Sequence, residues 1–322
     1  MGRTNPPVKG AQKMIVSIGG NAIARKGQAG TISEQFANVA IACRSISSII
    51  RSGRPVIITH GNGPAVGNLL IQNEAASAQV PPMPLYICNA DSECSLGLII
   101  QQSLYNALRS SDMEREIATV LTQVIVARSD TAFADPQKPI GPFYDEQAAL
   151  VLSRDRGWVM KEDARRGFRR VVASPKPLRV VEAGVIKRLS EQGVIVIAAG
   201  GGGVPVFESA EGLLTGVDAV IDKDLATALL ASVVKAETLL NLTGIEMVYK
   251  AFGTPSQAGL SQMSISEARS YLDKGEFEPG SMKPKIEAAL EFLEDGGKEV
   301  FITTPELAEE ALSGRAGTRI YR

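Results

Sequence analysis

Three glycine-rich loops, each following a short apolar run, contain the residues of this chain whose types and spacing best suit chemistry. The apolar runs cover residues 14–18, 55–59 and 194–199, and the glycines that follow are Gly19 and Gly20, Gly61 and Gly63, and Gly200 to Gly203. Because glycine has no side chain, the backbone N–H groups of such loops can approach a ligand closely. One loop of this kind is usually a turn, but three at equivalent places predict a single anion-binding crevice.

The third loop carries the strongest signal for an anion. Gly201 and Gly202 are expected to present backbone N–H groups to a phosphate, and Lys223 then opens an apolar helix whose N-terminus adds positive charge. The chain has no G-x-x-x-x-G-K-[ST] string, and Pro205 stands where a G-x-G-x-x-G fingerprint needs its third glycine. The sequence therefore predicts an anion site of another kind, with a mobile turn as the alternative.

Three lysines could neutralise a phosphoryl group during its transfer. Lys223 lies near the third glycine loop, Lys138 lies in a proline-rich segment, and Lys285 ends the string GSMKPK. Phosphoryl transfer needs phosphates held in line and negative charge neutralised as it spreads, rather than covalent help from the protein. Asp218 and Asp222 could position these lysines or hold Mg²⁺. A single lysine of this kind is more often a solvated surface residue, so the three count only together.

The small number of histidines and cysteines excludes several kinds of site. The only histidine, His60, and the three cysteines, Cys43, Cys88 and Cys94, make a poor zinc set and too small a disulfide framework. No Ser–His–Asp or Cys–His set can be assigned with one histidine. We expect His60 to shape its turn by hydrogen bonding rather than to act as a general base, and we expect free thiols in a reducing compartment.

Composition excludes two further classes. The chain has 322 residues and a net charge of −1, and it has no long basic run, so we expect no nucleic-acid partner. No apolar run is long enough to span a bilayer, so we expect no membrane partner. Residues 1–13 lack the apolar core of a secretory signal and are expected to form a flexible lead. A cytoplasmic location follows as an expectation.

The elements that must position these residues alternate along the chain. Residues 33–52 place apolar side chains at helical spacing between the first two runs, with Ser33 as the expected N-cap and Gly53 as the stop. Residues 119–127 are expected to form one further strand. Continuous apolar strands with crossover helices predict a parallel sheet covered on both faces, hence an α/β fold with three αβα layers. Ligands of such sheets bind beyond the carboxyl ends of the strands.

The character of the sequence changes at about residues 129–178. This segment is rich in proline and charge, and it contains Lys138 and Trp158 but few long apolar runs. We expect a small subdomain that protrudes from the sheet as a lid, because lids often bring extra charges to active sites. The alternative is a plain surface insertion. No linker divides the rest, so residues 14–322 are expected to form one domain with this insertion.

Eight strings along the chain resemble those of the carbamate kinases, a branch of the amino acid kinase superfamily. They are SIGGNA (17–22), THGNGPAVG (59–67), QKPIGPFY (137–144), RRVVASPKPLRVVE (169–182), VIAAGGGGVPV (196–206), GVDAVIDKDLATALLA (216–231), FGTP (252–255) and GSMKPK (280–285). They occur in the family's order over nearly the whole chain. The resemblance implies an open, mostly parallel sheet of about eight strands, a protruding subdomain and a homodimer.

The resemblance also implies a reaction and assigns roles by motif position. The reaction is reversible and Mg²⁺-dependent, and it converts ADP and carbamoyl phosphate into ATP and carbamate. The implied substrate and phosphate residues are Gly19, Gly20, Asn21, Gly61, Asn62 and Gly63. The implied catalytic residues are Lys138, Lys223 and Lys285, with Asp218 orienting the lysines, and the residues near the nucleotide are Thr243, Tyr249, Met282 and Lys285. Superfamily members often have a lysine where this chain has Ser17, and Lys138 is expected to replace that charge.

Two segments depart from the family pattern. Where carbamate kinases usually have AESQG or AMTQG, this chain has Ala90-Asp91-Ser92-Glu93-Cys94, and where they tend to have TDVD it has Thr243-Gly244-Ile245-Glu246. The first departure keeps open a related kinase that phosphorylates another small carboxylate or an N-carboxylated amine. A nucleotide-binding regulator with weak catalysis is a third interpretation, which the presence of all three lysines disfavours.

Overall fold

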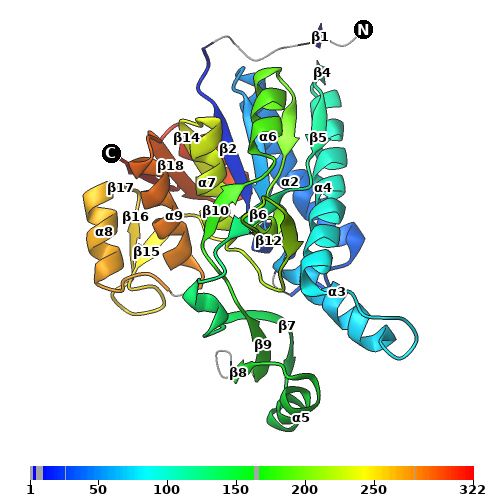
Figure 1. The fold of residues 1–322 in the computed structure, drawn as a ribbon. Coiled ribbons are helices and arrows are strands. Elements are labelled where there is room, and N and C mark those ends of the chain that lie inside the picture. Colours follow the sequence, from blue (N-terminus) through cyan, green and yellow to red (C-terminus); the bar gives the residue numbers. More distant parts are fainter. Residues whose placement is uncertain (1–2, 5–9, 26, 163–166, 279) are drawn as a thin grey trace.

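The computed structural model describes residues 3–4, 10–25, 27–162, 167–278 and 280–322, around a central sheet of eight strands (Figure 1). In spatial order the strands are β17 (Gln262–Ser264), β19 (Thr318–Tyr321), β18 (Glu299–Thr303), β14 (Thr238–Leu242), β2 (Met14–Ile18), β3 (Val56–His60), β11 (Ile195–Ile197) and β5 (Ile117–Thr119). Only the β18–β19 pair is antiparallel among neighbouring strands of this sheet. The predicted open, mostly parallel sheet is confirmed.

Helices cover both faces of this sheet. The helices of the main body are α1 (Gly20–Ile23), α2 (Ile32–Arg51), α3 (Gly63–Ala76), α4 (Leu85–Arg109), α6 (Ala183–Glu191), α7 (Lys223–Val234), α8 (Ile265–Asp273), α9 (Met282–Glu294) and α10 (Ala308–Leu312), with 3₁₀ turns η2 (Gly200–Gly202) and η3 (Pro305–Leu307). The expected helix at 33–52 begins slightly earlier, because Thr31 rather than Ser33 caps α2 through a reciprocal capping box with Glu34.

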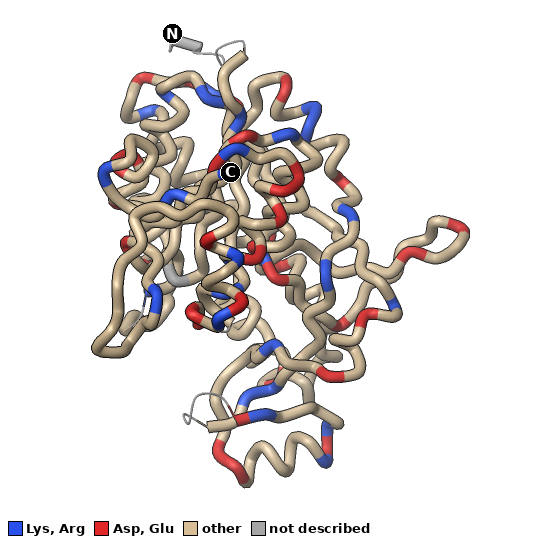
Figure 2. Tube along the Cα trace, turned by 90° about the vertical axis from the view of Figure 1, so that its left-hand side faces the viewer, with Lys and Arg blue, Asp and Glu red and all other residues tan. Residues whose placement is uncertain are grey.

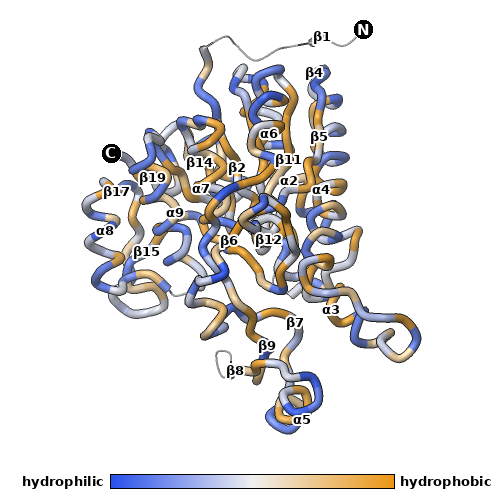
Figure 3. Tube along the Cα trace, in the orientation of Figure 1, coloured by the Kyte–Doolittle hydropathy of each residue, from blue (hydrophilic) through white to orange (hydrophobic). Residues whose placement is uncertain are grey.

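Alternating side chains of the strands build two separate cores. Ile15 of β2 packs in a core with α6, α7 and α9, whereas Val16 and Ile18 pack in a second core with α2, α4 and α10. Successive side chains of a strand point to opposite faces, so a strand that is apolar throughout must be buried on both. Figure 3 shows this as hydrophobic central strands inside helices whose outer turns are hydrophilic. The predicted three-layer αβα arrangement is confirmed.

The expected single strand at 119–127 is wrong, because the chain passes from one sheet to another within it. β5 ends at Thr119 in the main sheet, and β6 (Gln123–Val126) lies in a second sheet of order β10-β6-β12-β13, with β10 (Pro177–Val180), β12 (Val204–Glu208) and β13 (Leu214–Gly216). Buried Thr122 lies where the chain passes between the two sheets. Its hydroxyl accepts a hydrogen bond from Ala199 N at 2.9 Å and donates one to Val120 O at 2.8 Å.

The segment expected to form a lid, residues 129–178, carries a small sheet of its own, which we call the lid sheet. Its strands are β7 (Lys138–Tyr144), β9 (Phe168–Val172) and β8 (Met160–Glu162), with helix α5 (Glu146–Arg156) and 3₁₀ turn η1 (Thr131–Phe133). Figure 1 shows β7, β8, β9 and α5 beyond one end of the main sheet. Figure 2 shows basic and acidic residues interspersed along the whole trace, this end included.

Two short pairings complete the described structure. β15 (Val248–Lys250) pairs with β16 (Ala258–Leu260), and β1 (Arg3–Thr4) pairs with β4 (Met113–Glu114). The rest of the expected flexible lead up to residue 9 lies outside the described residues. No helix in the described part of the chain has the length and apolarity needed to cross a membrane.

Candidate active site

A cleft of about 780 Å³ opens at the carboxyl ends of β2, β3 and β14, next to the lid sheet. It is lined by ten of the residues that the sequence predicts for the site: Gly19, Gly20, Gly61, Asn62, Gly63, Lys138, Gly201, Lys223, Thr243 and Lys285. They come from segments far apart in the chain. Parallel strands bring their carboxyl ends to one edge of a sheet, so the fold gathers them as the sequence predicts.

Close backbone approach explains the glycines of this cleft. A Cβ atom on Gly61 would lie 2.9 Å from Gly20 N, and one on Gly19 would lie 3.0 Å from Leu242 O. Gly201 has φ +65°, and its Cβ would lie 2.2 Å from the Asn62 side chain. The three glycine loops therefore meet one another, leaving backbone groups at the cleft surface with no side chain to cover them.

Two lysines share one buried aspartate at the back of the cleft. Lys223 Nζ lies 2.8 Å from Asp224 Oδ1, and Lys285 Nζ lies 2.8 Å from Asp224 Oδ2. Asn241 of β14 donates its amide to Asp224 Oδ1 at 2.8 Å, and Lys223 also donates to Ser17 Oγ of β2 at 2.8 Å. The positions of both lysine side chains are therefore fixed by groups on the sheet and on α7.

The elements explain why these groups meet. Lys223 is the first residue of α7, and Asp222 caps that helix by accepting from Asp224 N at 2.9 Å. Ser17 points to the face of β2 that α7 covers, because neighbouring Val16 and Ile18 point to the other face. Lys285 lies in the first turns of α9, which packs beside α7 in the same core.

The two lysines and Asp224 stabilise one another's charged forms. Burial alone would raise the pKa of Asp224, but Lys223 and Lys285 outweigh it and hold that pKa below its usual range. Burial lowers the pKa of Lys223, an effect that Asp224 opposes. An unpaired charge at this depth would be costly, which is why each lysine is paired with the carboxylate. Because two ammonium groups share one carboxylate, the cluster as a whole is positive.

The third lysine, Lys138, lies on the lid sheet. Lys138, the first residue of β7, lies 2.9 Å from Asp222 Oδ2 and keeps 34% of its side chain exposed. Its β9 neighbour is Val172. The pair Lys138–Asp222 therefore links the lid sheet to the N-terminus of α7, next to the two buried lysines.

Asp218 does not orient the lysines, contrary to what the sequence led us to expect. Its Oδ1 accepts a hydrogen bond from Tyr86 N at 3.4 Å, near the start of α4, and its side chain lines a different cavity. Among the described carboxylates, Asp222 and Asp224 contact the lysines. The sequence signal for Asp224 was present in the string IDKD, where a second aspartate follows Lys223 directly.

The remaining predicted residues lie around the cleft or behind it. Met282 packs in the hydrophobic core. The Tyr249 ring lies beside that of Phe252 in a tilted arrangement, with ring centroids 6.0 Å apart. Neither residue lines the 780 Å³ cleft. Gly202 belongs to the third glycine loop but does not line the cleft, and a Cβ on it would lie 2.5 Å from Ile221 O. Asn21 lies in α1, but its side chain is outside the described residues.

His60 has the structural role that the sequence favoured. It is fully buried, and its Nδ1 lies 3.2 Å from Gly61 O. Burial is the main cause that lowers its pKa to about 4, so the imidazole is neutral near pH 7. A buried, neutral ring inside the loop shapes the turn of Gly61 rather than reaching a substrate.

Glu93 is a buried acid that sequence reasoning noted only as a departure from the family pattern. It is 1% exposed on α4, and its carboxyl group accepts hydrogen bonds from Gly200 N at 2.9 Å and from Thr122 N at 3.3 Å. Desolvation is the main cause that raises its pKa to about 8, and the two N–H groups oppose that rise. Glu93 therefore anchors the glycine loop from behind.

Comparison with known proteins identifies the family. The family model described as "Amino acid kinase family" matches residues 12–304. The carbamate kinases of Pyrococcus horikoshii and Pyrococcus furiosus are 45% and 46% identical to this chain, covering 96% of it and 99% of each relative. The chain belongs to the amino acid kinase family, among the carbamate kinases. It is therefore a kinase, an enzyme that transfers a phosphoryl group.

The family fold is visible in solved structures as well. The carbamate kinase from Giardia lamblia bound to AMP-PNP superposes with a TM-score of 0.91 at 39% identity, covering 98% of this chain and 99% of that one. The cleft therefore lies in a scaffold that 98% of this chain shares with a carbamate kinase.

Proposed function

We propose that the cleft catalyses reversible phosphoryl transfer between carbamoyl phosphate and ADP, which gives carbamate and ATP. The observation that carries the proposal is the convergence of Lys138, Lys223 and Lys285 on two neighbouring aspartates beside the glycine loops. Family membership supports the choice of substrate, because the carbamate kinases of Pyrococcus horikoshii and Pyrococcus furiosus match this chain over 99% of their length.

Each group has a defined task in this scheme. An oxygen of the ADP β-phosphate attacks the phosphorus of carbamoyl phosphate, and the bond from phosphorus to the carbamate oxygen breaks, so carbamate leaves with the electron pair. Lys223 and Lys285, fixed by Asp224, stabilise the charge that spreads over the transferred group. The backbone of Gly20 and Gly61, which lies beside the Lys223 side chain, binds the small substrate.

The nucleotide and Mg²⁺ are proposed to enter together. No cluster of three or more His, Cys, Asp or Glu side chains is arranged to hold a metal within the described residues. Mg²⁺ is usually bound by substrate phosphates and one or two carboxylates, and Asp222, at the cleft wall and 15% exposed, fits that part. When bound, Mg²⁺ neutralises phosphate charge. Binding of AMP-PNP by the Giardia lamblia enzyme supports a nucleotide as a ligand of this chain. We place it beside Thr243 and Lys285 because both residues line the cleft.

A homodimer and a cytoplasmic location complete the proposal. The resemblance to carbamate kinases implies the dimer. All three cysteines are free thiols, which suits a reducing compartment.

A coupled assay tests the proposed reaction directly. Purified enzyme with ADP, Mg²⁺ and carbamoyl phosphate should form ATP far faster than the enzyme-free control, and chelation of Mg²⁺ should stop it. Acetyl phosphate with ADP, and N-acetylglutamate with ATP, serve as competing substrate pairs. If carbamoyl phosphate gives no rate above the control while another small carboxylate is phosphorylated, the enzyme is the related kinase instead.

A further inference from the structure

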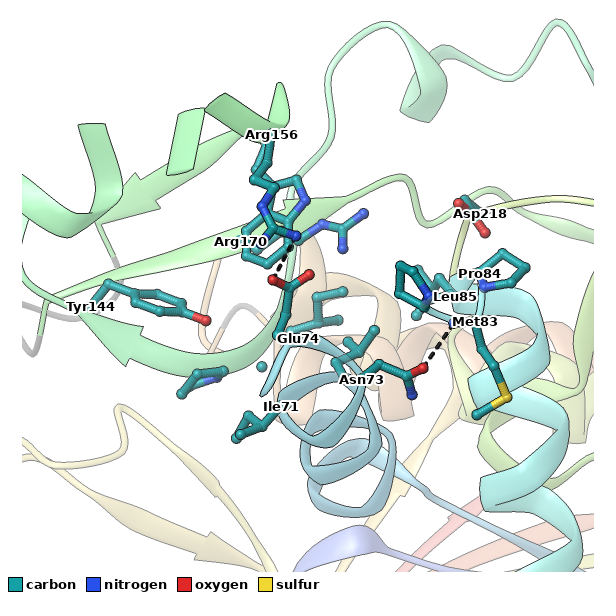
Figure 4. Close-up of a pocket in the computed structure, with 16 residues that line it drawn as sticks. Ile71, Asn73, Glu74, Met83, Pro84, Leu85, Tyr144, Arg156, Arg170 and Asp218 are labelled. Atoms are coloured by element: carbon teal, nitrogen blue, oxygen red, sulfur yellow. Dashed lines mark hydrogen bonds and ion pairs between the residues drawn. The ribbon is translucent and has the colours of Figure 1, made fainter. Parts of the chain in front are cut away.

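A second cavity of about 290 Å³ lies between the lid sheet and the main body, apart from the lysine cluster (Figure 4). The main body contributes α3, Asp218 and the loop before α4, and the lid contributes β7, β9, α5 and Trp158. Its volume is close to the lower end of the range of roughly 300–1,000 Å³ that is usual for small-molecule sites. Ile71 and residues 140–142 also line the larger cleft, so they form the wall between the two.

The walls of this second cavity are mostly apolar, with a few charged groups among them. Leu70, Leu85, Ile140 and Trp158 are among the apolar lining residues. Such a lining, with a small number of placed polar groups, is typical of sites that bind the apolar body of a small molecule. It is unsuited to a nucleotide or to phosphates, which need several cations or backbone N–H groups.

The charged lining residues are two arginines and two acids, and they leave one unpaired charge of each sign. Arg156 Nη1 lies 2.8 Å from Glu74 Oε2, so these two neutralise each other. Arg170 stacks on Trp158, with its guanidinium 4.6 Å from the ring centroid, and within the described chain no carboxylate lies at ion-pair distance from it. Asp218 has only the long contact with Tyr86 N.

Arg170 and Asp218 therefore offer a cation and an anion on the wall of one apolar cavity, close enough for their charges to interact but not at ion-pair distance. Burial lowers the pKa of the Arg170 guanidinium, while Asp218 and Glu74 oppose that shift, so the environment of Arg170 is partly desolvated. A guanidinium pairs strongly with a carboxylate, and a carboxylate with an ammonium group. The molecule that satisfies both, and fills the apolar remainder, is an amino acid with a large apolar side chain.

We propose that this second cavity binds a free α-amino acid of the aromatic or branched aliphatic type. Its carboxylate pairs with Arg170, its ammonium group faces Asp218, and its side chain packs on Ile140 and Leu85. The ligand bridges lid and body, and it touches the strand that begins with Lys138. The site is separate from the proposed phosphoryl transfer, and its occupancy can be measured without turnover.

The chain offers a built-in reporter of binding, because Trp158 is its only tryptophan and lines this cavity. Titration of the full-length protein with L-phenylalanine and with L-leucine should give a saturable change in tryptophan fluorescence. 3-Phenylpropanoate lacks the ammonium group and 2-phenylethylamine lacks the carboxylate, so each should bind about tenfold more weakly than L-phenylalanine, or worse. No saturable signal with either amino acid, in fluorescence and in calorimetry, overturns the proposal.

Variants locate the contacts. Arg170→Met keeps side-chain bulk and should weaken L-phenylalanine binding about tenfold or more, while the binding of 2-phenylethylamine should not change. Asp218→Asn should weaken L-phenylalanine but not 3-phenylpropanoate. Arg154→Met is the matched control, because Arg154 is a lid arginine whose side chain is 75% exposed on α5, and it should bind as wild type. Equal affinity of Arg170→Met and wild type for L-phenylalanine contradicts the assignment.

Hydrogen exchange on the wild-type protein supplies a test that does not depend on how a variant folds. L-Phenylalanine should slow exchange in β7, in β9 and at the start of α4, and leave β18 and β19 unchanged. Protection confined to the lysine cluster would show that the amino acid binds in the larger cleft, and would overturn the second site.

Discussion

Asp224 is the residue on which the two buried lysines depend, since it contacts both ammonium groups at 2.8 Å. The lysines in turn keep the carboxylate ionised at a depth where a lone charge would be costly. This mutual dependence fixes the geometry before any substrate binds, which is the condition for effective electrostatic stabilisation of a transition state.

Lys223→Ala is expected to lower kcat by roughly 10² or more, by analogy with the loss of one preorganised charge-stabilising donor. Steady-state kinetics in the ATP-forming direction measure this effect. Lys235→Ala, at the far end of the same helix, is the matched control and should leave kcat unchanged. A rise in KM with normal kcat would mean that Lys223 only binds the ground state.

Gly201→Val is expected to abolish turnover in a chain that still folds. The substitution combines a backbone φ of +65° with a Cβ that would lie 2.2 Å from Asn62, so the glycine loop must move away from the cleft. Circular dichroism and thermal melting check the fold. Gly212→Val is the control, because that glycine also has positive φ but has open space around it, in the turn between β12 and β13. Wild-type activity in folded Gly201→Val would show that the loop is only a turn.

Glu93→Gln is expected to change how stability depends on pH. The pKa of Glu93 is about 8 in the folded protein against 4.5 for an ordinary glutamate, so between these pH values the unfolded chain binds fewer protons than the folded one. The free energy of unfolding of the wild type should therefore fall relative to Glu93→Gln as pH rises from about 4.5 to 8, and the difference should level off above that. Urea unfolding at pH 5, 6.5 and 8 measures it, and parallel curves would contradict the raised pKa.

At the scale of elements, α7 and β7 bring charge to the same place in different ways. α7 holds Lys223 at its N-terminus against the main sheet, where the lysine is buried. β7 holds Lys138 on the lid sheet, where the lysine is partly exposed and pairs with Asp222. A position built on the main sheet should be preformed, and one on a protruding sheet should depend on where that sheet lies.

Lys138→Ala is therefore expected to lower kcat strongly while changing nucleotide binding little. Lys138→Arg should restore little activity, because a planar guanidinium does not replace a compact ammonium group at one fixed point. Lys161→Ala, which removes another lid lysine that pairs only with Asp135 in the described structure, is the control. ADP and carbamoyl phosphate together should slow hydrogen exchange in β7 and β9, and near-normal kcat in Lys138→Ala would refute the role.

In the whole molecule, helices bury both faces of one sheet (Figure 1), and the cleft lies at the carboxyl ends of its strands. The proposed homodimer needs a further surface, and α4 exposes Leu98 and Tyr105, seven residues apart on one face, with exposed fractions of 60% and 49%. Sedimentation should give twice the chain mass of 34.1 kDa, and Leu98→Lys should shift the protein toward the single-chain mass. A single-chain mass for the wild type would contradict the proposed homodimer.

The sequence by itself determined the layers of the fold and the location of the cleft. Apolar runs such as residues 14–18 can be satisfied only by burial on both faces, and glycines at their ends are tolerated where backbones approach closely, so strand order was not needed to expect one anion crevice. The string around Lys223 likewise marked a helix N-terminus, because capping and apolar periodicity are local properties.

Only the tertiary structure decided which acids serve the lysines and where the chain changes sheet. Asp218, Asp222 and Asp224 are nearly adjacent in sequence, but the turn into α7 directs Asp224 to the buried lysines and leaves Asp218 beside α4. The break of residues 119–127 depends on Thr122 meeting Ala199, a partner 77 residues away. Such contacts depend on how elements far apart in the chain pack together, and the local sequence pattern carries no information about that packing.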